Sequence, residues 1–95
     1  MDEIERIKKK IVPVLKKFRV SKAGIFGSFA RGEQNKKSDV DILIEINQEA
    51  DLFDLIRLKM ELEGRINKKV DLVEYEHIRK EIKKNILNDE IPILR

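Results

Sequence analysis

One segment of the chain alternates strictly between β-branched apolar residues and other residues, and it limits the folds that the chain can adopt. From residue 39 to residue 46, every second residue is a β-branched apolar one. These residues are Val40, Ile42, Ile44 and Ile46, and the intervening ones are Asp39, Asp41, Leu43 and Glu45. A period of two is that of a β-strand, whose successive side chains point to opposite faces of a sheet. The segment therefore predicts a strand with one apolar face, which a layer of helices must cover.

Apolar residues at helical spacing elsewhere in the chain predict the helices of that layer. Five apolar residues near the N-terminus recur at spacings of three and four: Ile4, Ile7, Ile11, Leu15 and Phe18. They predict a helix over about residues 2–18, which Pro13 should kink or briefly break because proline lacks a backbone donor. A second helix should begin after Asp51, a good N-cap, and end near Asn67. Its inward residues are expected to be Leu52, Leu55, Ile56, Leu62 and Ile66. The first three of these belong to the core unless a partner protein covers them.

The remaining predicted elements are short. They are a buried strand over Ala23–Phe26, a helical turn over Ser28–Arg31, a polar loop over Gly32–Ser38, a strand over Val70–Val73 and a last helix marked by Ile78, Ile82 and Ile86. Pro92 excludes a central strand for residues 91–94, so this tail is expected at an edge. The order is helix, strand, short helix, strand, helix, strand, helix. It predicts an α/β fold with the helices packed mainly on one apolar face of the sheet.

The length of the chain predicts a single domain. At 95 residues, the chain can form one compact core over residues 1–95, so a second substrate-binding domain should belong to another molecule. Cysteine is absent and His77 is the one histidine, which excludes disulfides and multi-histidine metal sites and leaves His77 an expected structural role. No apolar run approaches the roughly 18 residues that span a bilayer. The N-terminus also lacks the apolar part of a signal peptide. We expect a cytoplasmic protein without membrane association.

The net charge of +3 hides an uneven distribution. Residues 1–37 carry eleven basic and four acidic side chains, and residues 38–76 carry five basic and eleven acidic ones. Electrostatic fields act locally, so this division is more informative than the total. The basic first part could face phosphate groups, and the acidic middle could hold a cation.

Three carboxylates are predicted on one face of the sheet. Asp39 and Asp41 are two residues apart on a strand and share a face, about 6–7 Å apart at their bases. At an effective dielectric constant near 20, their repulsion is about 2.5 kcal/mol. Asp71 lies between the apolar residues Val70 and Leu72, so it should face away from the core. If the two strands are neighbours, all three carboxylates meet. Three hard oxygen donors suit Mg²⁺, which binds carboxylates together with substrate phosphates.

A candidate phosphate site precedes these carboxylates. Gly27 allows a close backbone approach after a strand, and Ser28 opens a helical turn with free N–H groups and a hydroxyl. Arg31 lies three residues further on and could add a forked donor. The pattern matches neither the Rossmann nor the Walker glycine loop. Metal ions that bridge phosphate oxygens are the usual chemistry of phosphoryl or nucleotidyl transfer, so the sequence predicts such a reaction.

Each candidate residue also has an ordinary structural explanation. Asp39, Asp41 and Asp71 could lie on the solvated face of a strand. Gly27–Ser28 could be a simple turn and helix cap, and Arg31 could belong to a surface ion pair.

The stretch Gly27-Ser28-Phe29-Ala30-Arg31-Gly32, followed by Ser38-Asp39-Val40-Asp41, resembles the signature of the nucleotidyltransferase superfamily that includes DNA polymerase beta. The short chain and the GSFARG form of the motif resemble its smallest branch, the minimal nucleotidyltransferase (MNT, MntA-like) proteins. The resemblance covers nearly the whole chain, from the first helix through the Asp71 strand, and the C-terminal tail adds little. It implies the nucleotidyltransferase fold, a small mixed β-sheet flanked by helices.

The resemblance also implies a reaction, a partner and roles for the site residues. The reaction would be the transfer of AMP from ATP to a protein hydroxyl, assisted by two Mg²⁺ ions. By position, Gly27 and Ser28 would bind the triphosphate, Asp39 and Asp41 would hold both metal ions, and Asp71 would bind the catalytic metal and help to activate the attacking hydroxyl. Many members of this branch are antitoxins paired with a HEPN-domain toxin. The resemblance therefore implies a hetero-oligomer in which a tyrosine of that toxin is adenylylated.

Two other classes of function are compatible with the sequence. A non-catalytic antitoxin would neutralise its partner simply by covering it, with the acidic face as the contact. A nucleic-acid binder, or a transferase acting on RNA, would use the basic first part of the chain. The five aromatic residues and the lack of an RNA-binding motif argue against this last class.

Overall fold

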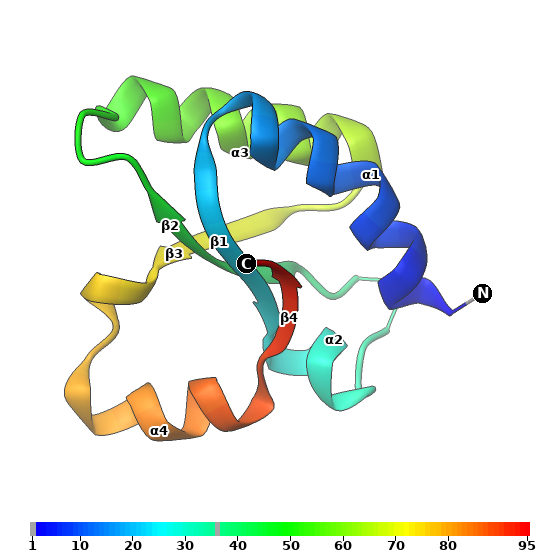
Figure 1. Cartoon of the computed structure of the whole chain (residues 1–95). Coiled ribbons are helices and arrows are strands. Elements are labelled where there is room, and N and C mark those ends of the chain that lie inside the picture. Colours follow the sequence, from blue (N-terminus) through cyan, green and yellow to red (C-terminus); the bar gives the residue numbers. More distant parts are fainter. Residues whose placement is uncertain (1, 36) are drawn as a thin grey trace.

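The computed structural model describes residues 2–35 and 37–95, which form a four-stranded sheet in the order β3-β2-β1-β4 with helices on its faces (Figure 1). The elements are α1 (Glu3–Lys17), β1 (Val20–Phe26), α2 (Gly27–Arg31), β2 (Val40–Ile46), α3 (Leu52–Ile66), β3 (Val70–Glu74), the 3-10 turn η1 (Tyr75–His77), α4 (Lys80–Asp89) and β4 (Ile91–Leu94). β1 pairs antiparallel with β2 and with β4, whereas β3 runs parallel to β2. The sheet is therefore mixed, as the resemblance implies.

Two predicted boundaries change in the structure. α1 continues without a break through Pro13, so of the predicted kink or brief break, the break is wrong. Its apolar face is buried on both sides of the proline, and that packing holds the helix together. β1 begins at Val20 rather than at Ala23, because the polar residues between them belong to a strand that pairs with β2.

The main core lies between one face of the sheet and the two long helices, α1 and α3, which run side by side above it in Figure 1. The fully buried residues include Ile11 and Leu15 from α1, Ile25 from β1, Ile42 and Ile44 from β2 and Leu62 from α3. The apolar half of the alternating segment therefore faces the helices, as predicted.

The inward face of α3 differs from the predicted one. The side chains that face the sheet are Leu55, Leu58, Leu62 and Ile66, spaced by three and four residues. Leu58, which the prediction omitted, is fully buried, whereas Leu52 and Ile56 are 68% and 44% exposed. Ile56 is rotated by one residue, or about 100°, from the stripe that contains Leu55. Leu52 stands in the first turn of the helix.

α4 covers the other face of the sheet (Figure 1). It has no buried residue and contacts β1 and α2. Ile78, which was expected to mark this helix, precedes it. The tail beyond α4 forms β4, an edge strand beside β1, in agreement with the expectation from Pro92. Across the described part of the chain, no helix has the length and apolar character needed to cross a membrane.

Candidate active site

The structure pairs two of the predicted carboxylates directly. β2 and β3 are neighbours, and in their parallel register Asp41 stands opposite Asp71. Val40 pairs with Val70 and Ile42 with Leu72, so the apolar partners match as well. Since the apolar residues of β2 face the core, Asp41 and Asp71 both point to the α4 face of the sheet. The condition on which the predicted cluster depended is met for these two residues.

The electrostatics of Asp41 reflect this crowding. Partial burial, followed by the charge of Asp71 and a hydrogen bond between the two carboxyl groups, raises the pKa of Asp41 to about 6. The charge of Asp39 raises it further, and the charge of Arg31 opposes these effects. Asp39 itself is exposed and immediately precedes β2. The site therefore has an unfavourable concentration of negative charge that a cation would relieve.

The glycine turn lies against the same carboxylate. Gly27 follows β1 and has a φ of 74°, a backbone conformation that residues other than glycine rarely adopt. A Cβ at this position would also overlap Asp41 Oδ2. Ser28 follows in α2, partly buried. The backbone of the candidate phosphate turn and the candidate metal ligand Asp41 are therefore adjacent.

A cavity of about 440 Å³ on the α4 face contains both paired carboxylates. Its remaining wall is mostly apolar and is formed by Phe26, Leu72, Val73, Ile78, Ile82 and Ile86, together with His77 and Arg79. His77 was expected to be structural, and Arg79 was not considered. No local pattern marks these two residues. They reach the cavity because η1 turns the chain back from β3 toward α4.

Arg31 forms the surface ion pairs that were its alternative explanation. Its Nε donates to Glu33 Oε2 at 3.2 Å, and its Nη1 donates to Asp89 Oδ2 at 3.3 Å. These hydrogen bonds raise the pKa of the guanidinium, which therefore stays charged. The second bond ties α2 to the end of α4. Arg31 is close enough to Asp41 to affect its pKa, and its role as a nucleotide ligand stays a prediction.

The donor set suits Mg²⁺, although the described residues contain no ready-made group of three acidic or histidine ligands. Asp41 and Asp71 provide hard oxygen donors at paired positions, and their repulsion disfavours two free negative charges. Asp39 and Asp71 are both exposed, whereas Asp41 is partly buried. The roles of all three as metal ligands stay predictions.

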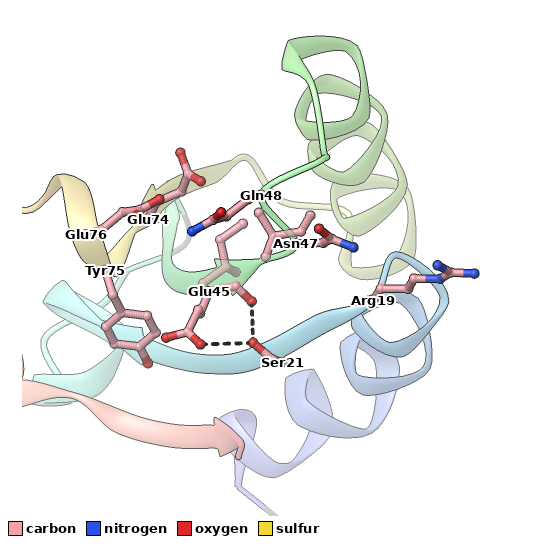
Figure 2. A pocket seen from close by; sticks show the side chains of 10 residues that line it. Arg19, Ser21, Glu45, Asn47, Gln48, Glu74, Tyr75 and Glu76 are labelled. Atoms are coloured by element: carbon pink, nitrogen blue, oxygen red, sulfur yellow. Dashed lines mark hydrogen bonds between the residues drawn. The ribbon is translucent and has the colours of Figure 1, made fainter.

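A second polar cavity, of about 390 Å³, lies at the opposite end of β2 and includes none of the predicted site residues. Figure 2 shows its side chains, among them Ser21, Glu45 and Tyr75. Ser21 donates to the backbone carbonyl and to the carboxylate of Glu45, at 3.1 Å and 3.3 Å. This cavity lacks the neighbouring glycine turn and the paired aspartates that phosphate chemistry requires.

Paired aspartates beside a glycine turn, on the α4 face of a mixed α/β sheet, define a nucleotidyltransferase. The chain belongs to the polymerase beta nucleotidyltransferase family, whose model matches residues 9–95. Its chemistry is therefore that of an enzyme with a nucleotide substrate.

Relatives and solved structures agree with this assignment. A protein of Methanocaldococcus jannaschii, named as a candidate protein adenylyltransferase (MJ0435), is 47% identical over 91 residues, which cover 96% of this chain and 98% of the relative. A structure described as a minimal nucleotidyltransferase superposes with a TM-score of 0.82 at 29% identity, and the match covers 97% of this chain and 96% of the other. The MNT antitoxin complex of Shewanella oneidensis, solved with a tri-AMPylated HEPN toxin, has a TM-score of 0.72 and covers 94% of this chain and 70% of the other. At 18% identity, this last match shows a shared fold alone.

Proposed function

We propose that this chain transfers AMP from ATP to a hydroxyl group of a partner protein. The observation that carries the proposal is the adjacency of Asp41, Asp71 and the Gly27 turn. That arrangement places carboxylates for a cation beside backbone donors for phosphate. The relative named as a protein adenylyltransferase, which matches nearly end to end, supports a protein acceptor.

In the proposed reaction, the hydroxyl oxygen of the acceptor attacks the α-phosphorus of ATP. The new oxygen–phosphorus bond forms, the bond from the α-phosphorus to the bridging oxygen breaks, and pyrophosphate leaves with the bonding electrons. The hydroxyl proton passes to the carboxylate of Asp71. Gly27 and Ser28 orient the leaving phosphates through backbone N–H groups and a hydroxyl. Mg²⁺ held by Asp39, Asp41 and Asp71 would neutralise charge on the phosphate oxygens.

The proposed acceptor is a tyrosine of a HEPN-domain toxin, and the chain acts as its antitoxin in a hetero-oligomer. The fold shared with the Shewanella MNT antitoxin, which was solved on an AMPylated HEPN toxin, supports this partner. The reaction consumes ATP, which supports a location in the cytoplasm.

The proposal is tested by incubating the protein with α-labelled ATP, Mg²⁺ and a HEPN-domain protein that co-purifies with it. We expect label, and a mass increase of one adenylyl group, on the HEPN-domain protein. Asp41→Asn should lower the rate by about 10²–10³-fold, the usual cost of removing one electrostatic group from an active site. Glu49→Gln, which removes an exposed carboxylate outside the site, is the matched control and should leave the rate unchanged.

Two results would contradict the proposal. Full activity of the Asp41→Asn variant would exclude the proposed role of Asp41 as a metal ligand. Complete neutralisation of the toxin by Asp39→Asn/Asp41→Asn protein without ATP would instead favour the non-catalytic antitoxin.

A further inference from the structure

We propose that the acceptor protein docks in an apolar groove between α3 and the outer edge of β3, hereafter the α3–β3 groove. The occupant is a protein segment that presents apolar side chains next to the hydroxyl that is modified. This inference rests on the transfer reaction proposed above and adds the direction from which the acceptor arrives.

The α3–β3 groove is a cavity of about 390 Å³ with mainly apolar walls. Leu55 and Ile56 line it from α3, and Leu72 and Val73 line it from β3. The exposed apolar surface continues along α3 beyond the cavity. Its large side chains are Leu52, Phe53, Ile56 and Met60, which are 68%, 67%, 44% and 65% exposed. A contiguous group of exposed apolar side chains on one helix is typical of a protein contact surface.

The position of the groove follows from the geometry of the reaction. In a displacement at phosphorus, the attacking and leaving oxygens lie on opposite sides of the phosphorus atom. Across the sheet, the order is Gly27 at the end of β1, then Asp41 on β2, then Asp71 on β3. If pyrophosphate leaves at the Gly27 turn, the acceptor must approach from beyond Asp71, which is the outer edge of β3.

The groove and the active-site cavity meet at that edge. Asp71, Leu72, Val73 and His77 line both. His77 Nδ1 lies 3.0 Å from Glu74 Oε2, which holds the imidazole at the junction. A side chain that enters from the groove therefore reaches Asp71 without crossing α3 or α4.

The chemistry of the groove favours a protein over other occupants. The charged residues on its wall are of both signs and include Lys59, Asp71 and Glu74, so the groove lacks the basic surface that nucleic acid needs. β3 has a sheet neighbour on one side only, and an extended segment could add to its free side. A symmetric contact between two copies of the groove would bring two Asp71 clusters together, and their repulsion disfavours a second copy.

The test measures recognition of the protein acceptor separately from binding of the nucleotide. Leu52→Ser and Ile56→Ser remove exposed apolar side chains from the groove wall and leave the carboxylates in place. With α-labelled ATP and the HEPN-domain acceptor, we expect each substitution to raise the KM for the acceptor by roughly tenfold, as loss of an anchoring side chain does at protein interfaces. Without the acceptor, the Kd for MgATP in a calorimetric titration should stay unchanged. Leu87→Ser is the matched control, because Leu87 is an exposed apolar residue of α4 outside the groove, and both readouts should match the wild type.

The outcomes separate the two proposals. If the wild type labels no protein, both the proposed transfer reaction and the proposed docking surface are contradicted. If the wild type labels the acceptor and the groove variants do so with an unchanged KM, only the docking surface is overturned.

A second measurement identifies the occupant directly. The chain contains no cysteine, so Phe53→Cys introduces a unique thiol that can carry a benzophenone photo-cross-linker. A cross-link to the acceptor supports the inference, whereas a cross-link between two copies of this chain contradicts it.

Discussion

Gly27, in the candidate phosphate turn, packs closely against the carboxylate of Asp41. Its φ of 74° and the closeness of Asp41 Oδ2 both disfavour a side chain here. Gly32 offers a matched control, since its φ is 72° but a Cβ there would meet no atom within 4 Å.

We expect Gly32→Ala to lower the free energy of unfolding by about 1–2 kcal/mol, the cost of a left-handed conformation. Gly27→Ala should lower it by about 1–3 kcal/mol more, because Asp41 must also move. Urea denaturation of both variants measures the difference. An equal loss in the two would mean that the contact with Asp41 has no energetic weight.

In the protein without metal, the negative charge of Asp41 should lower the free energy of unfolding at neutral pH. The folded-state pKa of about 6 lies above the ordinary value of 3.8. Stability that depends on the protonated form is fully present below about pH 3.8 and is lost as the pH rises through about 6.

Asp41→Asn should therefore raise the free energy of unfolding at pH 7.5 by about 1–2 kcal/mol, after allowance for solvent screening at this half-buried group. Near pH 4 the gain should almost vanish. Thermal unfolding in EDTA across this range measures it, with Glu49→Gln as the control expected to stay within about 0.5 kcal/mol of the wild type. A gain that does not depend on pH would exclude titration of Asp41 as its cause.

At the scale of elements, α3 has two apolar surfaces with different tasks. Leu58 is fully buried against the sheet, whereas Leu52 is 68% exposed. We expect Leu58→Ala to lower the free energy of unfolding by about 2–5 kcal/mol and Leu52→Ala by less than about 0.5 kcal/mol. Denaturant unfolding of the pair measures both values. Comparable losses would place Leu52 in the core, as the sequence had predicted.

The tie between α2 and α4 competes with nucleotide binding if Arg31 contacts phosphate. Asp89 accepts from Arg31 at the end of α4. We expect Asp89→Asn to tighten MgATP binding by roughly two- to fivefold, because a single exposed ion pair is worth little more. Calorimetric titration with MgATP checks this, and Arg31→Gln should weaken binding instead. Unchanged affinity in both variants would leave Arg31 a structural residue.

For the whole molecule, nucleotide binding should stabilise all elements together, because the site draws on β1, β2 and β3. At free MgATP 100 times its Kd, the gain is about 2.7 kcal/mol, or roughly 10–20 °C in Tm for a domain of this size. EDTA should remove most of this shift, and Asp41→Asn should show little of it. A full shift in EDTA would mean that the nucleotide binds without a cation.

Local patterns in the sequence predicted the elements well, because periodicity reports burial directly. The alternating segment around Asp41 became β2, and Asp51 caps α3 through its hydrogen bond to the N–H of Asp54. Long-range features were harder to predict. The strand order and the turn that brings His77 to the cavity depend on which elements pack together, and no local pattern encodes that. The burial of Leu58 could have been predicted, because its spacing from Leu55 and Leu62 is that of one helix face.

The parallel register of β2 and β3 makes the fold and the catalytic centre fail together. Asp41 and Asp71 meet because Val40 pairs with Val70. A slip of one residue would turn every side chain of β3 to the opposite face, sending Asp71 into the apolar layer and Leu72 into water. A mispaired chain would thus lose its stability and its chemistry in one step. Any misfolded molecule of this kind would be inert toward ATP, so the pool of folded protein and the pool of competent enzyme are one and the same.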